Sequence, residues 1–154
     1  MYLWKIDQLK KKLSTDGLTE KQLYYYILIY VAVNSIGVET IGFFPHESPT
    51  IWSYAGAIIN ISIAVFGTAM VFRANGGESG VQFAARYFSI SLVAIIRFIL
   101  FSIPLTAVLM LYLFASDGLA SDIPVDAILD SVSAIWYTLF YAYIIKHIRQ
   151  VATA

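Results

Sequence analysis

The chain has 154 residues, of which 59% are hydrophobic and 13% are charged, and its formal net charge is zero. Charged residues make up about 25% of ordinary soluble domains, so this composition excludes a typical soluble domain and predicts a protein of the lipid bilayer. The chain has no cysteine, which excludes disulfides, thiolate nucleophiles and thiolate metal sites.

Residues 1–21 precede the first long apolar run. They contain no compact apolar stretch followed by a small-residue cleavage site, so they do not form a signal peptide. Apolar residues recur at helical spacing, at Tyr2, Ile6, Leu9 and Leu13. Trp4 and the lysines around it suit a surface of anionic head groups. We therefore expect a short amphipathic helix on the inner leaflet; a disordered tail and a partner-docking helix are the alternatives.

Four apolar segments follow, each long enough to cross a hydrocarbon core of about 30 Å. They lie at about 23–44, 51–72, 87–115 and 126–145, within a transmembrane domain of residues 22–148. Thr19 and Gln22 have the spacing of a capping box at the start of the first segment. The predicted fold is an all-α integral membrane protein with a bundle of four transmembrane helices.

The basic residues predict the orientation of these helices. Nine of the ten lie before the first segment, between the second and third, or after the fourth: Lys5, Lys10, Lys11, Lys12, Lys21, Arg73, Arg86, Lys146 and Arg149. The other two loops carry acidic residues instead, at Glu47, Asp117, Asp122 and Asp126. Positively charged loops stay in the cytoplasm. Both termini, including the basic tail 146–154, are therefore expected there.

Arg97 lies inside the third apolar segment, eleven residues beyond Arg86. At about 1.5 Å per helical residue it is roughly 16 Å into the hydrocarbon core, so its charge should face protein or water. Asn34 and Asn60 have a similar depth in their own segments. The hypothesis is a buried polar layer of these three residues.

Two carboxylates are candidates to complete this layer. Glu39 leans toward the midplane and is the better charge partner, whereas Asp130 leans away from it because its helix starts on the other side. Three roles remain open for the layer: structural contact between helices or an arginine that extends to the inner head groups, a functional ion or solute site, and a protein–protein contact.

Small residues and one amide recur every three or four positions in the second segment. They are Ser53, Gly56, Asn60, Ala64 and Gly67. Such a face lets another helix approach closely. We expect packing inside the same chain, with a contact between copies as the alternative.

No catalytic, metal or cofactor site is predicted. His46 and His147 lie at opposite ends of the expected spans, and no serine–histidine–acid set or pair of carboxylates shares a helix turn. An enzyme is therefore not expected.

The leading function is a small, oligomeric membrane subunit that binds or anchors a membrane or cytoplasmic protein. The alternative is a channel or carrier, anion-selective because of Arg97, and a third option is a membrane component of bacterial defence or immunity. We expect the lipid bilayer and a second copy or another protein as partners, no nucleic acid, and a bacterial inner membrane as the location.

Overall fold

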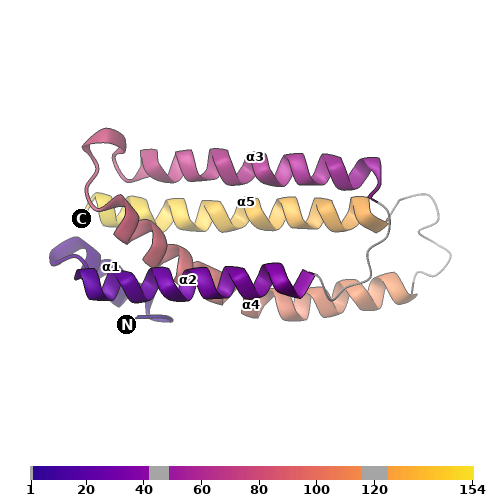
Figure 1. The fold of residues 1–154 in the computed structure, drawn as a ribbon, viewed down its shortest axis with the longest axis horizontal. Helices are drawn as coiled ribbons and strands as arrows, with labels where there is room; N and C mark the ends of the chain where they lie inside the picture. The colour runs from indigo at the N-terminus through magenta and orange to yellow at the C-terminus, as the bar shows by residue number, and fades with distance from the viewer. Residues whose placement is uncertain (1, 42–48, 116–124) are drawn as a thin grey trace.

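Helices account for all the regular structure in the residues that the computed structural model describes, which are 2–41, 49–115 and 125–154. In chain order they are α1 (Ile6–Thr15), α2 (Glu20–Ile41), α3 (Ile51–Ala74), the 3-10 turn η1 (Gly77–Ser79), α4 (Phe83–Ala115) and α5 (Val125–Ala152). Both termini lie at one end of the molecule, which we call the terminal end (Figure 1). Three acidic residues of the expected outer loops, Glu47, Asp117 and Asp122, lie outside the described residues.

In the described part of the chain, three helices are long and apolar enough to cross a membrane, over Ile51–Ala74, Phe83–Leu109 and Ala127–Ala152. By length and composition they indicate a transmembrane protein. They correspond to the second, third and fourth of the apolar segments. Helix α2, which corresponds to the first, is not among the three. It contains Asn34 and Glu39, and residues 42–44 at the end of this segment lie outside the described part of the chain.

Polar caps fix where two of the helices begin. The Thr19 amide donates to Oε1 of Gln22 over 3.1 Å, and the Gln22 amide donates to Oγ1 of Thr19 over 3.3 Å, so the predicted capping box is confirmed. Helix α3 begins with a second capping box, between Thr50 and Ser53. Each box satisfies amide groups that the first helical turn leaves without a partner.

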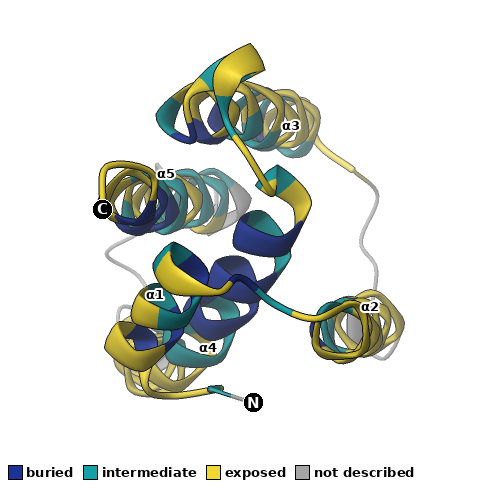
Figure 2. Cartoon of the chain, turned by 90° about the vertical axis from the view of Figure 1, so that its left-hand side faces the viewer, coloured by how far each residue is buried: buried dark blue, intermediate teal, exposed yellow. Residues whose placement is uncertain are grey.

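The long helices form an open row rather than a closed bundle. In the described part of the chain α3 packs along α5, α5 against α4, and α4 against α2 (Figures 1 and 2). A closed bundle would also need extensive contact between α2 and either α3 or α5, and the described residues make none. Helices in lipid gain no hydrophobic free energy by closing, because the lipid tails are as apolar as their side chains.

Helix α1 packs beside α4 and α5 (Figure 2). Its apolar face consists of Ile6, Leu9 and Leu13, and these three side chains are buried in the protein. This differs from the expected placement on the inner leaflet, where the same face would contact lipid. An amphipathic pattern fits either surface, and here the protein covers it.

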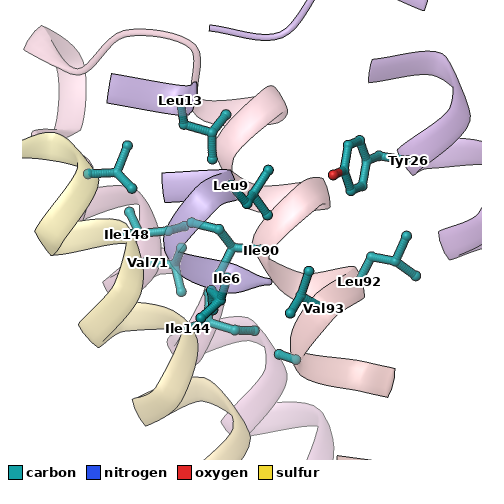
Figure 3. Packing of buried hydrophobic residues seen from close by; sticks show 12 residues of the cluster. Ile6, Leu9, Leu13, Tyr26, Val71, Ile90, Leu92, Val93, Ile144 and Ile148 are labelled. Atoms are coloured by element: carbon teal, nitrogen blue, oxygen red, sulfur yellow. The ribbon is translucent and has the colours of Figure 1, made fainter. Parts of the chain in front are cut away.

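The buried aliphatic side chains form one cluster (Figure 3). It is made mainly by α1 and by the parts of α4 and α5 at the terminal end (Figure 1). Leu9 of α1, Ile90 of α4 and Ile148 of α5 are each 0% exposed. Toward the opposite end, large apolar side chains face outward, such as Phe101 at 67% and Leu111 at 68% exposed. The molecule therefore has an internally packed end and an end whose apolar surface is open.

Candidate functional site

Arg97 joins the N-terminal segment to α5. Its guanidinium donates one hydrogen bond to the hydroxyl of Tyr143 over 2.7 Å and another to the main-chain carbonyl of Trp4 over 2.6 Å. The guanidinium carbon also lies 5.4 Å from the centre of the Trp4 ring, within the range of a cation–π interaction. We call Trp4, Arg97 and Tyr143 the Arg97 junction.

The structure does not bring the residues of the hypothetical polar layer together. Asn34 donates to the carbonyl of Tyr30 on its own helix, over 2.8 Å. Asn60 lies on α3, and its amide oxygen is buried without a hydrogen-bond partner. Glu39 is exposed on α2. Arg97 thus bonds to a hydroxyl and a carbonyl rather than to a carboxylate.

A row of polar contacts extends from the Arg97 junction along α5. The Tyr143 ring lies 4.3 Å from the His147 ring, between ring centres. His147 Nδ1 is 3.2 Å from Oε1 of Gln150, and the same oxygen accepts a hydrogen bond from Lys10 over 3.0 Å. This row fastens α1 to α5. It is a feature that the sequence reasoning missed.

Lys10 also forms an ion pair with Asp7 on α1, with 2.8 Å between the charged atoms. The hydrogen bond from Lys10, together with its charge, lowers the pKa of Asp7. Both groups are on a short helix whose apolar face is buried, so the charged face of α1 is directed away from the core.

The sequence contains one signal for the row of polar contacts on α5. Tyr143, His147 and Gln150 are four and three residues apart, a spacing that places them on one face of a helix.

The small-residue face of α3 packs against α5 of the same chain. Gly56 is buried against the side chain of Asp130, and Gly67 is buried against the ring of Tyr141; a Cβ at either glycine would clash there. Both pairs are eleven residues apart on their helices, so α3 and α5 run in the same direction. Asp130 therefore belongs to this contact and lies on a different part of α5 from Tyr143, the partner of Arg97.

A hydroxyl cluster lies next to this contact. The Thr68 hydroxyl is 3.4 Å from the hydroxyls of both Tyr87 and Tyr141, which come from α4 and α5.

Two further members of the predicted small-residue face, Ser53 and Ala64, are half-buried on α3. Ser53 acts in the capping box with Thr50.

Arg86 is a buried arginine at the terminal end, where it is 8% exposed. It donates to Oδ1 of Asn75 over 2.9 Å, and Asn75 in turn donates to the carbonyl of Val81. Asn75 follows the last residue of α3, and Gly76 adopts φ +103°, a conformation that favours glycine. This set holds the turn between α3 and α4 in place.

A groove of about 530 Å³ lies between α2, α4 and α5. Aromatic side chains make up much of its lining: Tyr30, Phe98, Trp136, Tyr137, Phe140 and Tyr141. Asn34 and Gly37 contribute from α2. Among the described residues, α2 packs against α4 and makes no extensive contact with α5. The groove is therefore open between α2 and α5.

Within the described ranges, no three histidine, aspartate or glutamate side chains are close enough together to hold a metal ion. Comparison of the chain with protein-family models, with curated proteins and with solved structures gives no match.

Proposed function

We propose that the chain is a non-enzymatic membrane subunit that crosses the bilayer four times and assembles with a second copy or another protein through a small helical head in the cytoplasm. The head consists of α1 with the adjoining ends of α2, α3, α4 and α5.

The single observation that carries the proposal is the position of the buried core. The hydrophobic effect acts only where the alternative to burial is water, and apolar helices gain nothing from it in lipid. Fully buried side chains such as Leu9, Ile90 and Ile148 at the terminal end therefore support a head that lies in water. The outward-facing Phe101 and Leu111 suit the lipid.

The Arg97 junction lies at the expected boundary between these two parts. Ala115, the end of α4, is eighteen residues beyond Arg97, and Val125, the start of α5, is eighteen residues before Tyr143. Each stretch is about 27 Å long at 1.5 Å per residue, which is close to the hydrocarbon thickness of about 30 Å. An arginine beside a tryptophan is also typical of the interface.

Charge supports a cytoplasmic location for the head. All ten basic residues lie in the head or at its boundary, including Lys5 and Lys11, which are exposed. The outer loops carry only acidic charges. Positively charged segments stay inside, so the head is the natural contact region for a cytoplasmic partner.

The alternative function, conduction of ions past Arg97, gains no support from the geometry. Asn34 and Asn60 lie on other helices and do not contact Arg97.

The test is the mass of the protein extracted into native lipid particles and measured by native mass spectrometry. We expect a complex heavier than one chain of 17.2 kDa. The double variant Lys5→Glu/Lys11→Glu, which reverses two exposed charges of the head, should release single chains. The matched control is Ile61→Leu on the outward face of α3, which should leave the complex intact. A single chain in the unmodified protein would overturn the proposal.

A further inference from the structure

The groove between α2, α4 and α5 has the size of a small-molecule site. Its volume of about 530 Å³ lies within the range of about 300–1,000 Å³ that is usual for such sites.

The groove is long enough for a flat ring with substituents. On α2 it extends from Tyr30 to Val38, which is about 12 Å at 1.5 Å per residue.

The lining offers aromatic faces and a few polar atoms. Phe98 packs edge to face with Trp136 and with Phe140, at 5.0 Å and 5.4 Å between ring centres, which gives the groove a wall of ordered rings. The side-chain nitrogen of Asn34 donates a hydrogen bond to the carbonyl of Tyr30. The side-chain oxygen of Asn34 can therefore accept a hydrogen bond from a ligand. The Tyr137 hydroxyl, also in the lining, can donate one.

We propose that this groove binds one lipid-soluble molecule with a flat ring that carries hydroxyl or carbonyl oxygens, of the quinone and quinol type. The molecule enters from the bilayer through the open side between α2 and α5. Its ring lies against Phe98 and Trp136, and its oxygens bond to Asn34 and Tyr137. This inference rests on the four membrane crossings of the proposed function, which place α2 beside α4 and α5 in the bilayer, and not on the head or on assembly.

Trp136 provides the measurement, because quinones quench tryptophan fluorescence on contact. The Trp136-only variant carries Trp4→Phe and Trp52→Phe, and a Trp52-only variant with Trp4→Phe and Trp136→Phe is its control. Both are reconstituted in lipid nanodiscs and titrated with decylubiquinone. We expect saturable quenching of Trp136 at concentrations that leave Trp52 almost unchanged.

Gly37 tests the position of the ligand. Gly37 lines the groove, and a Cβ there meets no other atom within 4 Å, so we expect Gly37→Leu to occupy part of the groove and to fold. We expect it to weaken quenching of Trp136 at least tenfold, while Val31→Leu on the exposed side of α2 has no effect.

Two results would overturn the proposal. One is quenching that does not saturate and is equal for both tryptophans, which means that the quinone only dissolves in the lipid. The other is quenching of Trp136 by phospholipids with brominated acyl chains that decylubiquinone does not relieve, which means that a hydrocarbon chain occupies the groove.

Discussion

The guanidinium of Arg97 bonds to the main-chain carbonyl of Trp4, a residue ninety-three positions earlier in the sequence. This bond makes the N-terminal segment part of the folded structure. The acceptor belongs to the backbone, so the identity of residue 4 does not determine the bond. The arginine, in contrast, has no substitute of the same length and hydrogen-bonding capacity.

Replacing Arg97 should loosen the N-terminal segment without preventing folding. Arg97→Leu removes two hydrogen bonds from a charged donor, worth about 1.5–3 kcal/mol each. The buried side chains of Leu9, Ile90 and Ile148 are not changed, so the chain should still fold. Trypsin, in contrast, should cut at Lys10–Lys12 more than tenfold faster in inside-out vesicles.

Tyr143→Phe serves as the graded comparison, because it removes only one of the two bonds of Arg97 and should give an intermediate rate of cleavage. Equal protection of residues 10–12 in the unmodified protein and in Arg97→Leu would contradict the role of the Arg97 junction.

The core of the proposed head should contribute more stability than the outward apolar surface. Leu9→Ala removes a side chain that is 0% exposed and should lower the free energy of unfolding by about 2–5 kcal/mol. Leu139→Ala makes the same chemical change on α5 at a residue that is 52% exposed, and it should have a much smaller effect. Thermal unfolding in mild detergent measures both; similar losses would count against a packed head.

The contact between α3 and α5 should not tolerate a larger residue at Gly67. Gly67→Val places methyl groups where the Tyr141 ring lies, and overpacking of this kind costs about 1–3 kcal/mol. Gly37→Val on α2, where a Cβ has open space, is the matched control. An unfolding temperature that falls equally in both variants would point to an effect of valine itself rather than to the contact with α5.

Single cysteines can locate the membrane, since the chain has none of its own. Lys11→Cys and Gln150→Cys in the proposed head should react with a membrane-impermeant maleimide in inside-out vesicles and remain unlabelled in intact cells. Ile61→Cys, on the outward face of α3, should be unlabelled from either side. Labelling of Lys11→Cys from the outside of intact cells would reverse the proposed orientation.

The sequence predicted local features better than partners. The capping box of Thr19 and Gln22 is confirmed because it involves residues three apart. The hydrogen bond between Arg97 and Trp4 was not predicted, because the sequence next to each residue carries no signal that the two are partners. The equal depths of Asn34 and Asn60 were misleading for a similar reason: depth along a helix does not determine which neighbour its face meets, and α2 and α3 lie at opposite ends of the row.

The parallel direction of α3 and α5 has a consequence for biosynthesis. Among the described residues, the most extensive contact between helices joins these two, yet all of α4 lies between them in the sequence. Helix α3 must therefore enter the bilayer and stay there while the ribosome completes fifty further residues, up to the start of α5. The mean hydropathy of α3 is 2.0 over its 18-residue apolar stretch, which allows this helix to insert without a partner helix. A nascent chain that stops before residue 125 would leave Gly56 and Gly67 facing lipid.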